Sequence, residues 1–413
     1  MILKQDGSVW STAVFGQRSV GRHVGKYFEN VIENCAIAVA AGNGFSIVIK
    51  QGGGVWAVGR NYHGQLGDGT KVKKDTFFFV ETVYGANNAA AGDYHSMILT
   101  KHGRVWAAGL NEHGQLGDRS KSSASRFRLV ISHGAETVAA GDTHTVVLHG
   151  DTSVWAAGRN VYGQLGDGTK IDRNTFMQVV SEGVTFATAG GHHSLLVKTD
   201  GSVWATGWNE FGQLGDASTI DVINYVQVVS SGAKTVAAGR RHSMLLKQDG
   251  SVWATGYNGN GQLGDGWTIN SKVFVRVMLN GAISVATGGF HSMVLKTDGS
   301  LWATGSNKYG QYGDGTTTSR KNFAKLTPFG KRPEHGMTCA RLFISYTPAL
   351  LQLVVLSAQV AQTRQPPFEL LSFAWSYAIG QFGPCDALSS RIFGCDFYAG
   401  TSQHYCYYEQ GSH

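Results

Sequence analysis

A glycine-rich segment recurs along the chain and is the first candidate for chemistry. It reads GQLGDGT at residues 64–70 and 163–169, and variants start at residues 114, 212, 261 and 310. A phosphate-binding P-loop needs a Gly-Lys-Ser/Thr step at the start of a helix, which these copies lack. A calcium loop needs several carboxylates, whereas each copy offers one aspartate. We interpret the segment as a structural turn, with metal binding as the weaker alternative. Its Gln and Asp would bond local backbone amides, and its Leu would fill a gap between repeats.

Histidine and tryptophan recur with the same spacing. Each histidine precedes Ser or Thr, each tryptophan lies in a VWA or LWA step, and successive copies are 49 or 50 residues apart. A metal ring would require imidazoles to converge from separate repeats. We therefore expect the histidines to be buried and bonded to neighbouring backbone, and the tryptophans to pack between repeats. These structural repeat residues are His95, His144, His193, His242, His291, Trp56, Trp106, Trp155, Trp204, Trp253 and Trp302.

The chain contains no recognisable catalytic constellation. It has no G-x-S-x-G nucleophile turn, no H-E-x-x-H zinc motif, and no carboxylate pair that stands apart from the repeats. We therefore expect a non-catalytic protein without cofactor or metal.

The repeat unit predicts four short β-strands, which we call A to D in chain order. From Lys234, the apolar runs KTVAAG and HSMLLK flank a Gly-x-x-His turn, and SVWATG follows an Asp-Gly turn. VFVRVM then alternates, as a half-exposed strand does. No unit shows helical periodicity, and no proline precedes Pro328. Units of about 50 residues with four strands predict an all-β propeller of four-stranded antiparallel blades.

Three motifs recur in one order: G-x-x-H-[ST], DG-x-VW-A-x-G and N-x-x-GQLGDG. In these motifs residues 1–330 resemble the regulator of chromosome condensation repeat family. The resemblance implies a seven-bladed β-propeller closed by pairing of N- and C-terminal repeat segments. In this arrangement residues 303–326 supply strand D of a blade whose central strands lie at the N-terminus. The strand A expected near residue 337 has no matching sequence.

The composition changes at about residue 336. All six prolines lie between Pro328 and Pro384, and no lysine follows Lys331. We divide the chain into a propeller of residues 1–335 and a C-terminal extension of residues 336–413, for which we expect a disordered or irregular structure. The apolar run at 342–362 contains a proline and several glutamines, which make it a poor membrane span. A segment that supplies a strand to the propeller is the alternative.

Function is best sought where the repeats differ from one another. Two positions vary in each Gly-x-x-His turn, and if strand A is innermost these turns surround one mouth of the ring. A mixed aromatic and cationic surface is typical of binding hot spots, and ordinary solvated turn residues are the alternative. The partner-binding candidates are Asp93, Tyr94, Asp142, His192, Arg240, Arg241 and Phe290.

The formal net charge of +7 comes entirely from residues 1–330, because residues 331–413 carry five basic and five acidic side chains. Loops between strands C and D are rich in Lys and Arg, and they share a face with the Gly-x-x-His turns because antiparallel strands alternate in direction. An electropositive face favours an acidic protein surface or nucleic-acid phosphate, and a solubilising rim is the alternative. The basic loop face comprises Lys71, Lys73, Lys74, Arg119, Lys121, Lys170, Arg173, Lys272, Arg320 and Lys321.

The resemblance implies functions of different classes. We expect a protein-interaction scaffold that binds a protein partner through its variable loop face. The alternative is guanine nucleotide exchange on a small GTPase, and the second alternative is chromatin or nucleic-acid association through the basic loops. The N-terminus shows no apolar signal-peptide region. We therefore expect a cytoplasmic location, with the nucleus as the alternative, and no membrane span.

Overall fold

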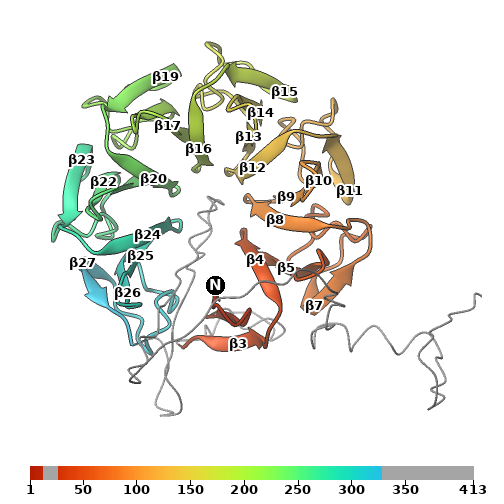
Figure 1. The fold of residues 1–413 in the computed structure, drawn as a ribbon, viewed down its shortest axis with the longest axis horizontal. Helices are drawn as coiled ribbons and strands as arrows, with labels where there is room; N and C mark the ends of the chain where they lie inside the picture. The colour runs from red at the N-terminus through yellow and green to blue at the C-terminus, as the bar shows by residue number, and fades with distance from the viewer. Residues whose placement is uncertain (13–26, 328–413) are drawn as a thin grey trace, which may run out of the picture. The chain divides into compact units, whose positions relative to one another are not determined.

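The computed structural model describes residues 1–12 and 27–327, so the predicted extension of residues 336–413 lies outside the described residues. The described chain contains β-strands and no helix. Its strands form seven sheets arranged around a common centre, as Figure 1 shows. We call these sheets blades I to VII in chain order. The predicted seven-bladed β-propeller is confirmed.

Blades II to VII each contain four antiparallel strands, and blade I contains three among the described residues. Blade I consists of β1 (Ile2–Leu3), β2 (Val9–Ser11) and β3 (Glu29–Ile32). Blade II consists of β4 (Ala36–Ala41), β5 (Phe45–Lys50), β6 (Val55–Gly59) and β7 (Lys74–Val80), and blade III of β8 (Ala86–Ala91), β9 (His95–Thr100), β10 (Val105–Gly109) and β11 (Ala124–Ile131).

The remaining blades repeat this order of strands. Blade IV consists of β12 (Ala135–Ala140), β13 (His144–His149), β14 (Val154–Gly158) and β15 (Arg173–Val180), and blade V of β16 (Val184–Ala189), β17 (His193–Lys198), β18 (Val203–Gly207) and β19 (Val222–Val229). Blade VI consists of β20 (Ala233–Ala238), β21 (His242–Lys247), β22 (Val252–Gly256) and β23 (Ser271–Met278), and blade VII of β24 (Ala282–Thr287), β25 (His291–Lys296), β26 (Leu301–Gly305) and β27 (Arg320–Lys325).

The hydrophobic core lies between neighbouring blades. Leu165, from the glycine-rich segment of blade IV, is fully buried in a cluster that joins Val146 and Leu148 of β13 to Val184 and Leu196 of blade V. The predicted role of this leucine as a plug between repeats is confirmed. Burial of one such side chain stabilises a fold by roughly 1.5–3 kcal/mol, so each contact between blades contributes to holding the ring together.

The two ends of the repeat region meet and close the ring. In five places the aspartate of a glycine-rich segment forms a β-bridge to strand D of the next blade, and a sixth bridge joins Asp314 of blade VII to Tyr27, just before β3. Phe28 and Ile2 pack in one cluster with Tyr312 of blade VII. The predicted closure by N- and C-terminal segments is confirmed.

The prediction assigned the last strand of the repeat region to the wrong blade. β27 pairs with β26 and completes blade VII, instead of joining the N-terminal strands. The outer strand of blade I is β3, which pairs with β2. A hairpin between neighbouring segments closes a shorter loop than a pairing between chain ends, so it has the lower entropy cost. Among the described residues blade I has no strand A, in agreement with the gap in the repeat sequence.

Candidate partner-binding face

Strand A is innermost in each of blades II to VII, and these six strands surround the centre of the ring (Figure 1). The Gly-x-x-His turns that follow them therefore lie around one mouth. The loops after strand C start on the same face, because the backbone N–H of Trp208 donates to the carbonyl of His192 (2.8 Å) and that of Tyr257 donates to Arg241 (2.8 Å). We call these turns, with the first residues of the loops after strand C, the mouth face.

Three of the predicted candidates form an ionic cluster on the mouth face. The guanidinium of Arg240, from the turn between β20 and β21, lies 3.1 Å from Asp142 Oδ2 and 3.6 Å from Asp93 Oδ2. Both carboxylates are buried, and Arg240 is half-buried. Burial and the negative charge of Asp93 raise the pKa of Asp142, although Arg240 opposes them. The cluster ties blades III, IV and VI together across the mouth.

His192 and Phe290 belong to a continuous row of aromatic rings on blades IV to VII. Its members lie in contact one after another, with ring centroids separated by 5.1–6.2 Å. Most of the neighbouring pairs are edge-to-face, an arrangement that adds stability beyond the area it buries. In spatial order the row consists of Tyr162, His192, Trp208, Phe211, Tyr257 and Phe290.

Arg241 lies over this aromatic row. Its guanidinium carbon is 5.4 Å from the ring centroid of Trp208, 5.2 Å from that of Phe211 and 6.0 Å from that of Tyr257. These are cation–π distances. Three rings therefore position one cation on the mouth face.

Tyr94 lies apart from the aromatic row, on blade III. Its hydroxyl accepts a hydrogen bond of 3.4 Å from Asn43, and its ring lies 5.0 Å from that of His63 on blade II. The seven predicted candidates thus fall into three groups. Three form the ionic cluster, three belong to the aromatic row with its arginine, and Tyr94 stands alone with its contacts to blade II.

Four of the five recurring histidines, those of blades III to VI, bond to the next blade. Ser243 donates its hydroxyl proton to the carbonyl of Gln213 (2.7 Å), so its oxygen accepts from Nε2–H of His193 (2.9 Å). The same relay joins His95 to Thr145, His144 to Ser194 and His242 to Ser292. The predicted bond to backbone is wrong, because the imidazole meets a neighbouring hydroxyl first and that hydroxyl contacts the backbone.

The recurring tryptophans lie partly buried at the contacts between blades. Trp204 of blade V packs against the core cluster that contains Leu165 of blade IV. Its indole N–H donates to Ser202 (2.9 Å), and the ammonium of Lys198 lies 4.2 Å from its ring centroid. The predicted position between repeats is confirmed for this residue, with a solvent-facing edge covered by lysine.

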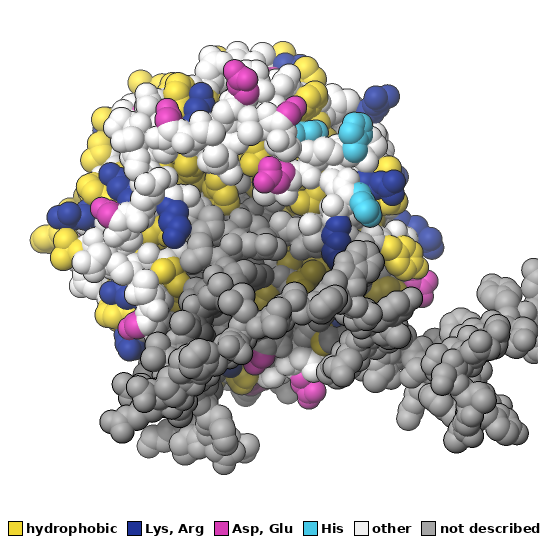
Figure 2. All heavy atoms as spheres, in the orientation of Figure 1, with side chains coloured by type: hydrophobic (Ala, Val, Ile, Leu, Met, Phe, Trp, Pro, Cys, Tyr) yellow, Lys and Arg dark blue, Asp and Glu magenta, His cyan; other side chains and the backbone are white. Residues whose placement is uncertain are grey.

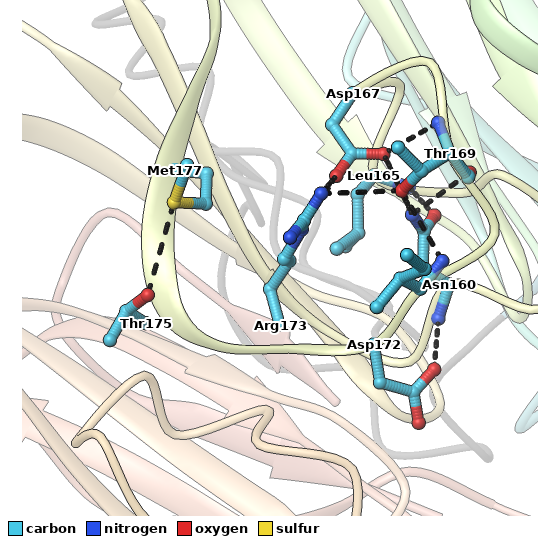
Figure 3. Close-up of polar contacts among 9 residues, drawn as sticks. Asn160, Leu165, Asp167, Thr169, Asp172, Arg173, Thr175 and Met177 are labelled. Atoms are coloured by element: carbon cyan, nitrogen blue, oxygen red, sulfur yellow. Dashed lines mark hydrogen bonds and ion pairs between the residues drawn. The ribbon is translucent and has the colours of Figure 1, made fainter.

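The glycine-rich segments are closed by their own side chains, as Figure 3 shows for blade IV. Asn160 accepts from the backbone N–H of Leu165 (3.0 Å) and donates to Asp167 (2.8 Å), which also accepts from the N–H of Thr169 (3.0 Å). Burial alone would raise the pKa of Asp167, but hydrogen bonds from Thr169, Arg173 and Asn160 outweigh it and lower that pKa. The segment is a structural turn, as the sequence indicates.

One glycine in this turn cannot carry a side chain. Gly166 has φ +76°, and a Cβ there would lie 2.5 Å from the ring of Tyr225 on the next blade. Both the left-handed backbone and the close approach of strand D require glycine. Among the described residues, no group of three or more His, Cys, Asp or Glu side chains is placed to hold a metal ion. No helix within residues 1–12 and 27–327 is long and apolar enough to cross a membrane.

Part of the basic loop face is neutralised by the repeats' own aspartates. In the face that Figure 2 shows, Lys and Arg lie mainly around the rim, with Asp and Glu between them. The paired members are Lys73 with Asp75, Lys74 with Asp68, Arg173 with Asp167 and Arg320 with Asp314. The exposed members are Lys71, Arg119, Lys121, Lys170, Lys272 and Lys321.

The turn pattern did not single out Tyr162, Trp208, Phe211 and Tyr257, which complete the aromatic row. They occupy positions next to the invariant Asn that follows strand C, where the repeats also vary. Trp208 and Tyr257 each bond to the backbone of the second variable turn residue. Variation between repeats at these positions could have identified the four residues as candidates.

Comparisons with known proteins agree with this fold. The family profile of the RCC1-like domain matches residues 1–279, and that of the regulator of chromosome condensation (RCC1) repeat matches residues 282–311. The human WBSCR16 structure has a TM-score of 0.68 at 22% identity, and the match covers 78% of this chain and 93% of that one. Prp20p from Saccharomyces cerevisiae has a TM-score of 0.67 at 19% identity, covering 78% of this chain and 85% of that one.

At these identities the two solved structures show a shared fold and nothing more specific. No curated protein matches the sequence closely enough to count as a relative. The profile of the RCC1-like domain spans well over half of the chain, and the described strands form the seven sheets that the repeat predicts. This protein therefore belongs to the RCC1-like domain family.

Proposed function

We propose that this protein is an interaction scaffold that docks a protein partner on the mouth face of blades IV to VI. The observation that carries the proposal is the aromatic row. Residues that the fold requires recur in most blades, whereas the row occupies one sector and is built from positions that differ between repeats. The fold does not demand these rings, and clustered aromatic side chains with arginine are typical of binding hot spots.

Exposed apolar side chains extend this sector outwards. Ile171, Ile220 and Ile269 occupy equivalent positions after the glycine-rich segments of blades IV, V and VI, and they are 62%, 73% and 72% exposed. Trp267 beside them is 65% exposed. Large apolar groups repeated on one face of three adjacent blades support a protein–protein contact.

Nucleotide exchange on a small GTPase is the alternative function. The structure of Prp20p is described together with its binding properties to Gsp1p and histones, and another structure shows Kap60 bound to this yeast protein. Those partners belong to Prp20p. For this chain, a GTPase that docks on the mouth face and then releases bound GDP faster would favour exchange over a scaffold role.

The test is affinity capture from cell extract with the full chain and two variants. Trp208→Ala/Tyr257→Ala removes two rings of the row. Tyr84→Ala is the matched control, because Tyr84 is 74% exposed in the connection between β7 and β8, on the opposite face of the ring. Circular dichroism and thermal unfolding verify that both variants fold.

We expect a partner that wild type and Tyr84→Ala retain and the double variant loses. Equal capture by all three proteins would refute docking on the mouth face. Each captured GTPase is then tested for release of a fluorescent guanine nucleotide in the presence of this protein.

A further inference from the structure

Most half-buried arginines near the mouth and in the adjoining loops are paired with a carboxylate. Arg240 contacts Asp142, Arg173 contacts Asp167, and Arg320 contacts Asp314. A guanidinium that is partly removed from water needs such a partner, because its desolvation is otherwise uncompensated.

Arg241 is an exception among the residues that the structure describes. It makes no ion pair within 4 Å there, and its close neighbours are the rings of Trp208, Phe211 and Tyr257. The charge of Arg241 lowers the pKa of Asp142, but the two groups form no ion pair within 4 Å. A guanidinium stacked on aromatic faces keeps its in-plane N–H donors at its edges, where they can bind a planar anion.

Arg159 is a second exception within the described chain. It follows β14 at the position equivalent to Trp208, it makes no ion pair there, and its buried Nε has no hydrogen-bond partner. Arg159 and Arg241 both act on His192: burial, and then the charges of Arg159, Arg240 and Arg241, lower the pKa of that imidazole to about 4. Trp208, over which Arg241 lies, also contacts the His192 ring, with 5.8 Å between ring centroids. Because His192 is neutral and Arg240 is paired, the uncompensated charge here belongs to Arg159 and Arg241.

We propose that Arg159 and Arg241 form a carboxylate-binding site for an acidic segment of the protein partner, bordered by His192 and Trp208. This inference rests on the proposed function and adds the chemistry of the partner. Each guanidinium can hold a carboxylate through two parallel N–H···O bonds, which gives direction as well as charge. The aromatic row then contacts apolar residues that flank the acidic side chain.

The surroundings favour a discrete carboxylate over a nucleic-acid backbone. Asp93, Asp142 and Asp172 lie near the same turns, and Asp172 is partly exposed in its contact with His113 (2.9 Å). A continuous polyanion would pass these carboxylates and be repelled, whereas an isolated acidic side chain can reach one of the arginines without passing them. Two lysines of the rim, Lys73 and Lys74, are also paired with aspartates.

The test uses the full chain and a fluorescein-labelled hexaglutamate peptide, followed by fluorescence anisotropy at low ionic strength. Arg159→Gln and Arg241→Gln are compared with Lys170→Gln and Lys272→Gln. Each control removes the same charge from an exposed lysine of the same blade as its arginine. Labelled hexaglutamine and a labelled 12-mer of thymidylate are the matched probes.

We expect each arginine variant to weaken hexaglutamate binding by about tenfold, which corresponds to loss of one charge-assisted hydrogen-bonded pair. Each lysine variant should weaken it less than about twofold. Equal losses in all four variants would mean general charge attraction and would overturn the site, as would undetectable binding of hexaglutamate by wild type. Tighter arginine-dependent binding of the thymidylate would overturn the acidic-peptide assignment.

Capture from extract separates this inference from the proposed function. If Trp208→Ala/Tyr257→Ala loses the partner while Arg159→Gln/Arg241→Gln retains it, docking on the mouth face stands and the carboxylate site fails. If both double variants retain the partner, the docking proposal and the carboxylate site are both refuted. If both double variants lose the partner and hexaglutamate binding depends on the two arginines, docking on the mouth face and the carboxylate site are both supported.

Discussion

Lowering the pH from 7.5 to 6.0 should destabilise this propeller by about 3 kcal/mol through four buried imidazoles. Burial lowers the pKa of His95, His193 and His242 to about 3, and that of His144 well below its ordinary value. Nε2–H of each ring is committed to a hydroxyl, and Nδ1 has no partner in the described chain. A proton added at Nδ1 would therefore create a buried charge without an acceptor.

The sign and size of this change in the free energy of unfolding follow from proton uptake by the unfolded state. There each imidazole has a pKa of about 6.5 and takes up protons as the pH falls, while the folded protein does not. Stability is therefore lost as the pH decreases through 6.5. Between pH 7.5 and 6.0 each ring contributes about 0.8 kcal/mol, and at pH 5.0 each contributes about 2 kcal/mol, so the four together approach the whole stability of a typical domain. His192 and His291, whose pKa values are also lowered, add to this loss, and Asp142, whose pKa is raised, opposes it.

The assay is urea denaturation at pH 7.5, 7.0, 6.5 and 6.0, with wild type, His193→Gln and His102→Gln. The glutamine amide at 193 can still donate to Ser243, but it does not titrate. The loss between pH 7.5 and 6.0 should be about 0.8 kcal/mol smaller in His193→Gln than in wild type. His102→Gln is the control, because its imidazole is exposed. An identical pH dependence in all three proteins would refute the role of the buried relay.

Four further substitutions test the packing and the mouth face by urea denaturation. Leu165→Ala should cost about 2–5 kcal/mol because it leaves a cavity between blades, and Ile171→Ala, on the exposed loop, should change stability by less than about 0.5 kcal/mol. Gly141→Ala should cost about 1–3 kcal/mol, because its Cβ would lie 2.3 Å from an imidazole carbon. Arg240→Ala should cost about 1–3 kcal/mol at pH 8 and less at pH 6, because the buried Asp142 left behind can take up a proton.

The sequence was sufficient for the architecture because the repeat is nearly regular. A period of 49 or 50 residues, the Asp-Gly turns and the absence of proline before Pro328 predict each strand of blade VI within two residues of its observed start. The allocation of strands at ring closure was not predictable in the same way. Blade I departs from the repeat, since its C–D connection spans residues 12–28 and its strand A has no matching sequence, so no copy-to-copy comparison constrains it.

The candidate site was only partly predictable, because its contacts cross between blades. Arg240 meets Asp93 and Asp142 over sequence separations of about 100 residues or more, and nothing in a single repeat indicates that pairing. The charge of Arg173 is likewise cancelled by Asp167 only because the loop folds back on itself. Counting Lys and Arg along the loops therefore overstates the charge that the face presents.

The repeat itself explains why the mouth face can specialise. Three hydrogen bonds recur around the ring: Leu N–H donates to Asn, His donates to the hydroxyl of the next blade, and a turn N–H donates to Asp. Stability is therefore distributed over many equivalent contacts. Turn residues between these fixed points do not contribute to those bonds through their side chains. Blades IV to VI carry aromatic rings at these positions, and two arginines there make no ion pair with any described residue, while blade II carries Asn43 and Gly44 in its turn. A ring held by its repeated residues can therefore change its partner by substitutions in a single sector.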